Sequence, residues 1–220
     1  MPRKPKSTCP PAEKAHMTRK RTYHKIRSGL LFLDCTVKAS ENCSEGEFLG
    51  KYMEILNHQL RAANKKEVEF ELAREYGSHK VKEALKYAEQ YTIHVSSHGE
   101  IDNNGKTYLA LSYGKLYSED IAGLWKDFKE KDRPLLLVLS ACCAGNQDLI
   151  AAFSENGCRY CIAPKDYVNW EHAALFSTFF YTYLFLEQMR PVTAFRKVIR
   201  SLPKLSGKWK IFDRGKEISK

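Results

Sequence analysis

A histidine and a cysteine each follow a strand-like segment of the sequence, and both side chains can take part in nucleophilic chemistry. His98 follows the segment YTIHVSS, and Cys142 follows RPLLLVLSA, 44 positions further on. A thiolate is a strong nucleophile, and an imidazole titrates near neutral pH and can carry the proton. The two residues predict thiol-dependent acyl transfer, on condition that the fold brings their strands together.

The segment before Cys142 has the pattern of a central strand. Residues 135–139 form a short, unbroken apolar run, preceded by Pro134 and followed by small residues as far as Gly145. This pattern is typical of a parallel strand that is covered on both faces. Small residues let the backbone turn sharply, and ligands of α/β folds bind at the carboxyl ends of such strands.

The rest of the chain alternates strand and helix patterns, with a turn signal in the middle. We expect a hairpin excursion around Asn103-Asn104-Gly105. The alternation predicts an α/β fold with a mainly parallel sheet and helices on both faces. The expected strands cover residues 29–35, 67–76, 91–96, 135–139, 159–163 and 209–212, and the expected helices cover 44–64, 78–90, 118–131, 146–155, 171–189 and 191–202.

These motifs resemble those of the caspase-like cysteine proteases. Ser97-His98-Gly99-Glu100, followed by Ser140-Ala141-Cys142 with Gly145, is most similar to the CHAT branch of that clan. The chain has Ser140 where caspases have Gln. Residues 168–197 also resemble the late helices of the CHAT branch.

The resemblance implies a fold, an activity and a domain organisation. It implies a caspase-like three-layer αβα sandwich over residues 28–215, between a basic arm (1–27) and a basic tail (216–220). The implied activity is that of a cysteine endopeptidase that cleaves protein or peptide substrates and needs no cofactor or metal. Relatives are regulated effectors of cell death or immunity, including antiphage defence, so we expect a small-molecule or protein activator, or activation by self-association.

The resemblance also supplies roles for single residues. His98 and Cys142 would form the catalytic dyad, and the backbone amides of Gly99 and Cys142 would form the oxyanion hole. In relatives that cleave after basic residues, an acid near the end of the first strand binds the P1 side chain, and Asp34 has a comparable position. Ser96 and Ser140 would line the same pocket. A solvated strand end is the other interpretation of Asp34.

Several alternatives remain open at this level. Cys143-Ala144-Gly145 also fits the Cys-x-Gly spacing of caspases, but the longer Ser-Ala-Cys match favours Cys142 as the nucleophile. Both cysteines could instead be buried small apolar residues with no catalytic role. Cys158 and Cys161 do not predict zinc, since residues three apart on a strand point to opposite faces. A catalytically silent scaffold with this fold is the main alternative function.

Charge and cysteine content bear on partners and compartment. The net charge is +10; residues 1–27 hold nine Lys or Arg and one Glu, whereas residues 203–220 hold six and two acids. The positive charge of the two ends together is larger than the net charge of the whole chain, so the residues between them are slightly acidic. Nucleic acid is therefore an expected partner only through the basic tails. No apolar run of signal-peptide length closely follows the basic N-terminus, and no segment approaches the length needed to span a membrane. Seven cysteines without an export signal predict reduced thiols in the cytoplasm.

Overall fold

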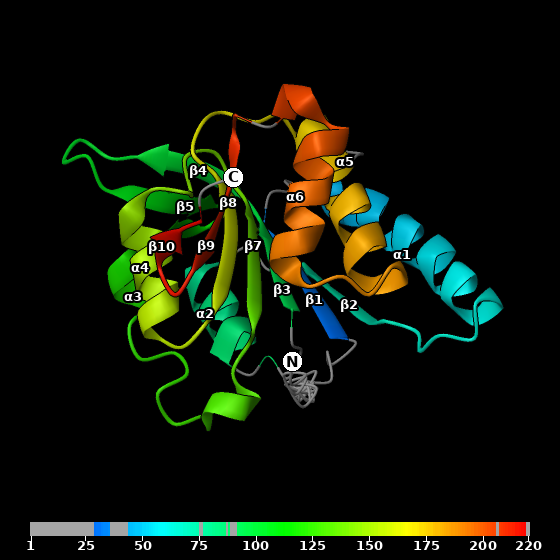
Figure 1. Cartoon of the computed structure of the whole chain (residues 1–220). Helices are drawn as coiled ribbons and strands as arrows, with labels where there is room; N and C mark the ends of the chain where they lie inside the picture. The colour runs from blue at the N-terminus through cyan, green and yellow to red at the C-terminus, as the bar shows by residue number, and fades with distance from the viewer. Residues whose placement is uncertain are drawn as a thin grey trace, which may run out of the picture.

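The centre of the molecule is a seven-stranded sheet with the strand order β10-β9-β8-β7-β3-β1-β2. The computed structural model describes residues 29–35, 44–74, 77–86, 88, 92–205 and 207–218. Strands β2, β1, β3, β7 and β8 run parallel, and β9 and β10 are each antiparallel to their neighbour (Figure 1). The mainly parallel sheet predicted from the sequence is confirmed.

The elements follow the expected alternation. The strands are β1 (Gly29–Asp34), β2 (Glu69–Arg74), β3 (Thr92–Ser96), β4 (His98–Ile101), β5 (Thr107–Leu111), β6 (Gly114–Leu116), β7 (Leu136–Ser140), β8 (Tyr160–Pro164), β9 (Trp209–Asp213) and β10 (Lys216–Glu217). The α-helices are α1 (Glu45–Ala62), α2 (Ser78–Lys86), α3 (Ser118–Ile121), α4 (Gln147–Glu155), α5 (Trp170–Tyr181) and α6 (Pro191–Ser201), with short helical turns at Glu130–Asp132, Thr182–Leu186 and Pro203–Leu205.

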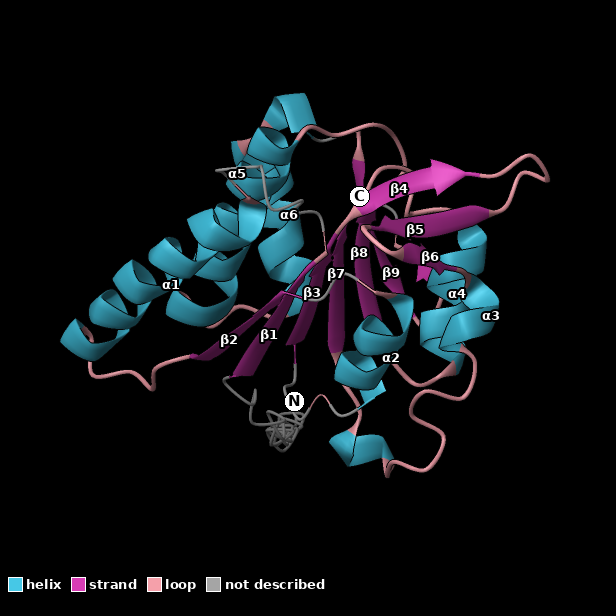
Figure 2. Cartoon of the chain, turned by 180° about the vertical axis from the view of Figure 1, so that it is seen from behind, coloured by secondary structure: helices cyan, strands magenta, loops and turns pink. Residues whose placement is uncertain are grey.

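Helices cover both faces of the sheet and make a three-layer αβα sandwich (Figures 1 and 2). The helices α1, α5 and α6 pack on one face, and α2, α3 and α4 pack on the other. Successive side chains of a strand point to opposite faces, so that Leu30 and Phe32 join the first core whereas Leu31 and Leu33 join the second. Burial on both faces explains why the central strands are apolar throughout.

The strands that lead to His98 and Cys142 are neighbours in the sheet. Strands β3 and β7 pair in parallel, and Ser96 lies opposite Ser140. The pairing continues one residue past the end of β3, since the N–H of Ser97 donates to the carbonyl oxygen of Ser140 over 3.2 Å. The predicted adjacency of these two strands is confirmed.

A second, smaller sheet begins at His98 and contains β4, β5 and β6. Strand β4 pairs antiparallel with β5 across the Asn103-Asn104-Gly105 turn, as the sequence predicts. Because β4 starts two residues after β3 ends, the chain changes sheets at His98. His98 therefore lies at a junction between two sheets.

Two predicted helices are shorter than expected. The helix expected over residues 118–131 ends at Ile121, because Gly123 adopts a positive φ of 77° and interrupts the helical backbone. The following turns bring Trp125 into the core, where its Nε1 donates to the carbonyl oxygen of Leu85 over 2.8 Å. The α-helix expected over residues 171–189 ends at Tyr181, and the chain continues as a π-helical turn over Thr182–Leu186.

The predicted C-terminal tail begins too early. Lys216 and Glu217 form β10, and Glu217 pairs with Lys165 at 2.6 Å and with Lys210 at 3.2 Å. The compact domain thus extends past residue 215, because an acid in the basic segment has two cationic partners. The predicted arm over residues 1–27 lies outside the described residues.

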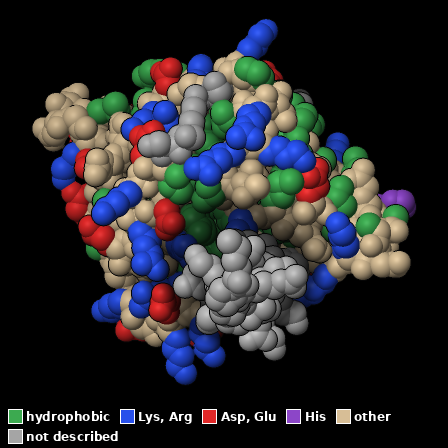
Figure 3. Space-filling view, viewed as in Figure 1, with side chains coloured by type: hydrophobic (Ala, Val, Ile, Leu, Met, Phe, Trp, Pro, Cys, Tyr) green, Lys and Arg blue, Asp and Glu red, His purple; other side chains and the backbone are tan. Residues whose placement is uncertain are grey.

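The surface shows mixed charge on the side viewed in Figure 3. Lys and Arg side chains alternate there with Asp and Glu, rather than gathering into one continuous band (Figure 3). Several cations of the described residues are paired with acids, as Lys197 is with Glu187 at 2.5 Å. No helix in the described part of the chain has the length and apolar character needed to cross a bilayer.

Candidate active site

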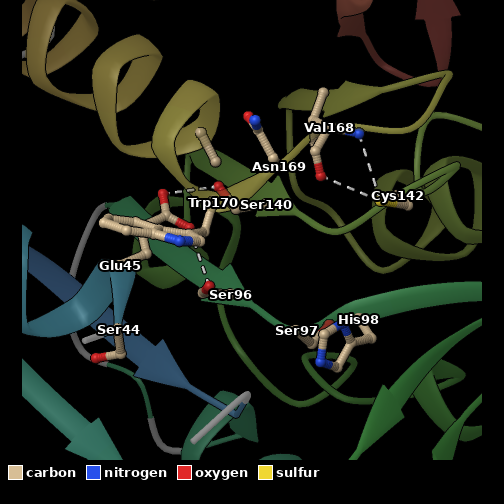
Figure 4. Close-up of a pocket in the computed structure, with 11 residues that line it drawn as sticks. Ser44, Glu45, Ser96, Ser97, His98, Ser140, Cys142, Val168, Asn169 and Trp170 are labelled. Atoms are coloured by element: carbon tan, nitrogen blue, oxygen red, sulfur yellow. Dashed lines mark hydrogen bonds between the residues drawn. The ribbon is translucent and has the colours of Figure 1, made fainter. Parts of the chain in front are cut away.

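A pocket of about 270 Å³ opens at the carboxyl ends of β3 and β7. Parallel sheets commonly bind ligands at this edge. Figure 4 shows His98 on one side of the pocket and Cys142 on another, with Glu45 further along. The pocket is lined by Ser44, Glu45, Ser96, Ser97, His98, Ser140, Cys142, Val168, Asn169, Trp170 and Ala173.

His98 and Cys142 occupy equivalent positions on neighbouring strands. Each lies two residues beyond one member of the pair formed by Ser96 and Ser140. His98 is exposed, and Cys142 is partly exposed. The structure therefore brings the two predicted catalytic side chains to one pocket and leaves both open to a ligand.

The sulfur of Cys142 is held by the backbone of the segment between β8 and α5. Its Sγ donates to the carbonyl oxygen of Val168 and accepts from the N–H of the same residue, each over 3.4 Å (Figure 4). Asn169, the next residue, caps α5 by accepting from the N–H of His172 over 3.1 Å. The position of the thiol thus depends on the start of α5.

Cys143 is placed less favourably for catalysis than Cys142. Its side chain is 8% exposed, and burial raises the pKa of its thiol, with the neighbouring Cys142 and Asp166 adding to the rise. Its backbone has a positive φ of 57°, which is uncommon for a residue other than glycine and makes the turn after β7 tight. A buried thiol with a raised pKa is a poor nucleophile.

Gly99 lies directly against the backbone of Cys142. A Cβ atom at position 99 would lie 1.8 Å from the carbonyl oxygen of Cys142 and 2.8 Å from its amide nitrogen. Only glycine fits there, so the strand that carries His98 and the turn that carries Cys142 touch through their main chains. The predicted oxyanion-hole residues are therefore immediate neighbours.

Glu45, the first residue of α1, is a pocket-lining acid that our sequence analysis did not identify. Its side chain is 3% exposed. The hydroxyl of Ser96 donates to Oε2 over 2.9 Å, and the hydroxyls of Ser140 and Ser177 donate to Oε1 over 3.0 and 3.1 Å. Burial raises the pKa of Glu45 to about 7, against the opposing effect of the three hydroxyls.

A buried histidine lies behind this carboxyl group. His94 Nε2 lies 2.8 Å from the hydroxyl of Ser140, and its Nδ1 lies 2.8 Å from the hydroxyl of Tyr181. Burial lowers the pKa of His94 to about 3, so the imidazole is neutral. Because Ser140 donates to Glu45, the hydroxyl of Ser140 accepts from Nε2–H of His94, and Tyr181 donates to Nδ1.

The structure places Asp34 behind the pocket rather than in its lining. Asp34 is fully buried at the end of β1, and its Oδ2 lies so near Gly46 that a Cβ there would be 2.6 Å away. The prediction that Asp34 contacts a substrate side chain is corrected accordingly, because α1 covers its carboxylate. The charge of Asp34 still acts on the pocket, since it contributes to the raised pKa of Glu45. Ser96 and Ser140 line the pocket and hold Glu45.

Little in the sequence distinguishes Glu45 from other acids. It follows Ser44, whose side-chain oxygen accepts from the N–H of Glu47 over 3.1 Å and caps the helix. Acids in the first turn of a helix are common, because they complement its dipole. Glu47 fits the same pattern but lies at the surface, paired with Arg74. Only the spatial position of Ser96, Ser140 and Ser177 distinguishes the two glutamates.

Comparisons with known proteins agree with this architecture. Residues 48–207 match the CHAT domain family. In structure, the chain is similar to the Drosophila initiator caspase Dronc, with a TM-score of 0.51 and 11% identity over 87% of this chain and 82% of that one. It is also similar to an inactive zymogen of a C11 protease from Parabacteroides distasonis, with a TM-score of 0.52, 8% identity and 84% of this chain covered.

The chain spans 61% of the length of that C11 protease. No curated protein matches the chain in sequence. At these identities the two solved structures establish the fold, and the family match covers most of the chain, including both His98 and Cys142. The chain therefore belongs to the CHAT domain family, within the clan of caspase-like cysteine proteases.

Proposed function

We propose that this chain is a cysteine endopeptidase in which Cys142 is the nucleophile and His98 is the general acid and base. One observation carries the proposal: β3 and β7 pair in parallel register, so that His98 and Cys142 follow paired serines and line one pocket. Membership of the CHAT family supports it. The tight contact between Gly99 and Cys142 supports it further, because it sets the backbones of the two expected oxyanion-hole residues against each other.

The reaction follows from these positions. The Sγ of Cys142 attacks the carbonyl carbon of the peptide bond, and the amides of Gly99 and Cys142 stabilise the negative charge on the oxygen. His98 takes the thiol proton and delivers it to the leaving amine as the C–N bond breaks, which leaves a thioester on Cys142. A water molecule, deprotonated by His98, then attacks the thioester and restores the free thiol.

Single substitutions in the dyad test the proposal. We expect Cys142→Ala and His98→Ala to lower kcat/KM for a peptide library by at least about 10²–10⁴-fold, the usual contribution of such groups. Cys143→Ala is the matched control, since it removes the adjacent buried thiol, and it should retain turnover. Undiminished turnover in either dyad variant would reject the assignment, and loss of turnover only in Cys143→Ala would make Cys143 the nucleophile.

We further propose that the enzyme is a regulated effector of the cell-death or immune type, antiphage defence included. The support is the family resemblance, together with the two contacts of Val168 that hold the thiol of Cys142. A ligand, a partner protein or a second copy of the chain would activate the enzyme by moving this segment. Loosening the segment with Val168→Gly should speed alkylation of Cys142 by iodoacetamide several-fold. An unchanged alkylation rate would exclude restraint of the thiol by Val168.

A further inference from the structure

The pocket that holds the two catalytic candidates continues to a single carboxyl group. Of the described residues that line it, Glu45 alone is acidic, and none is Lys or Arg. Glu45 and Cys142 both line this one pocket, and Figure 4 shows the carboxyl group of Glu45 set apart from Cys142 and His98. A side chain that enters beside the nucleophile would therefore meet Glu45.

Three hydroxyl groups around Glu45 donate to its carboxyl group. Three serine hydroxyls contribute hydrogen bonds, and the two on Oε1 come from different elements, Ser140 from β7 and Ser177 from α5. Behind Ser140, the chain of donors runs from Tyr181 to His94 to Ser140 to the carboxyl group. A directed chain of this kind strengthens each bond and fixes the carboxyl group in one orientation.

Nothing among the described neighbours of Glu45 supplies a positive charge. His94 Nε2 lies 3.4 Å from Oε1, but the pKa of this imidazole is lowered to about 3 by burial, so it is neutral. Burial, and Coulomb repulsion from Glu45, keep the phenol of Tyr181 protonated by raising its pKa. Asp34, on β1, adds a second negative charge nearby. A buried carboxylate without a cation is costly, and a cationic ligand would lower that cost.

We propose that Glu45 determines the P1 specificity of the enzyme, and that the pocket takes a P1 side chain ending in a cation, Arg or Lys. This inference rests on the proposed peptidase function. The carboxylate would accept charge-assisted hydrogen bonds from the guanidinium or ammonium group, and Ser44, Ser96 and Ser140 supply further oxygens along the pocket. In trypsin, too, an acid in the pocket that takes the P1 side chain sets the specificity of the enzyme.

Binding of the cation would be coupled to loss of the proton from the carboxyl group of Glu45. With its pKa raised to about 7, the carboxyl group of the empty pocket is largely protonated at pH 6 and largely ionised at pH 8. The groups that face it are Asp34 on β1, His94 on β3, Tyr181 on α5 and the three serine hydroxyls. His98 and Cys142 line the same pocket, and both remain in Glu45→Gln. Because His94 and Tyr181 do not change charge in this range, the pH dependence that Glu45→Gln removes is that of Glu45.

A binding experiment tests the pocket without turnover. The probes are n-butylguanidinium, which reproduces an arginine side chain, and the neutral n-butylurea of similar shape, titrated into the full chain and followed by NMR chemical shifts. We expect the cation to bind the unmodified protein about tenfold more tightly at pH 8 than at pH 6, and butylurea to bind weakly at both. Glu45→Gln, which keeps the hydrogen-bonding shape, should abolish the preference for the cation. Glu47→Gln, on the same helix but at the surface, should leave it unchanged.

A cleavage experiment then separates this inference from the proposed function. Peptides that carry Arg or the neutral isostere citrulline at P1 are compared by kcat/KM, and we expect a preference for Arg of at least about 100-fold, which Glu45→Gln reduces to near unity. Equal cleavage of both peptides, or cation binding that survives Glu45→Gln, overturns the inference and leaves the peptidase. Cation binding as predicted, with no cleavage of any peptide, supports the pocket and rejects the peptidase. If Glu45→Gln does not fold, the pH series is repeated on His98→Ala, which removes the imidazole from the pocket lining; tighter binding of the cation at pH 8 than at pH 6 is still expected there, and its loss would overturn the inference.

Discussion

Gly99 and Cys142 meet main chain to main chain, at a distance that leaves no room for a side chain at position 99. This contact joins the strand that begins with His98 to the turn that follows β7. The two catalytic candidates therefore owe their relative position to a backbone contact as well as to the pairing of β3 with β7.

Substitution of Gly99 by Ala should damage the site more than the fold. The new Cβ would overlap the carbonyl oxygen of Cys142, so the turn or the strand must move. A displacement of about 1 Å at a catalytic group can cost about 10²-fold in rate, and overpacking costs about 1–3 kcal/mol of stability. The measurements are kcat/KM and the free energy of unfolding.

Gly50, inside α1, is the matched control for this substitution. Among the described residues outside the backbone of α1, a Cβ at Gly50 would meet Phe70 Cε1 alone, at an ordinary 3.8 Å. Gly50→Ala should therefore raise stability by about 0.5–1 kcal/mol, as expected in a helix interior, and leave activity unchanged. Equal activity in Gly99→Ala and Gly50→Ala would contradict the contact described for Gly99.

Two neighbours of Glu45 should shift its ionisation in opposite directions. The charge of Asp34 contributes to raising the pKa of Glu45, whereas the hydroxyl of Ser177 lowers it. Asp34→Asn should therefore move the midpoint of n-butylguanidinium binding to lower pH, and Ser177→Ala should move it to higher pH. Neither side chain lines the pocket among the described residues, so a direct loss of contact would not produce this pair of shifts. Shifts of the same sign in both variants would contradict the assignment.

Glu45 should also give stability a characteristic dependence on pH. Its pKa is raised from an ordinary 4.5 to about 7 in the folded state, so folding favours the protonated form. This contribution is fully present below about pH 4.5 and is lost as the pH rises through 7. Between pH 5 and pH 8 the unmodified protein should lose about 3 kcal/mol relative to Glu45→Gln.

The measurement is urea unfolding of both proteins across this pH range. His94 contributes with the opposite sign, since its lowered pKa costs stability as the pH falls below about 6.5. Comparison with Glu45→Gln removes this contribution, because both proteins retain His94. A difference between the two proteins that stays constant with pH would show that Glu45 is ionised throughout.

The sequence was sufficient for the parts of the fold set by local patterns. The apolar run before Ser140 and the alternation around it predicted the parallel sheet, and the helix expected over residues 44–64 corresponds to α1. The family motif placed His98 and Cys142 at adjacent strand ends. These features depend on periodicity, capping and short motifs, which are visible in a single segment.

The remaining features depend on contacts between distant segments. Glu45 could not be separated from Glu47 without knowing that Ser177, 132 residues further on, reaches its carboxyl group. Asp34 was misplaced in the pocket because the packing of Gly46 over it has no sequence signal. The helix expected after Ser118 ends early, because Gly123 adopts a positive φ that the sequence pattern does not indicate. The errors on Glu45 and Asp34 reflect tertiary packing, and the error on the helix reflects the backbone conformation of Gly123.

Labelling of the nucleophile tests the central claim most directly. An irreversible peptidyl acyloxymethyl ketone with Arg at P1 is incubated with the full chain, and the adduct is located by fragment-ion mass spectrometry. We predict one adduct, on the Sγ of Cys142 and not on Cys143, formed at least about 100-fold more slowly in His98→Ala because the imidazole no longer assists the thiol. An adduct on Cys143, or labelling of Cys142 at the same rate without His98, would contradict the dyad.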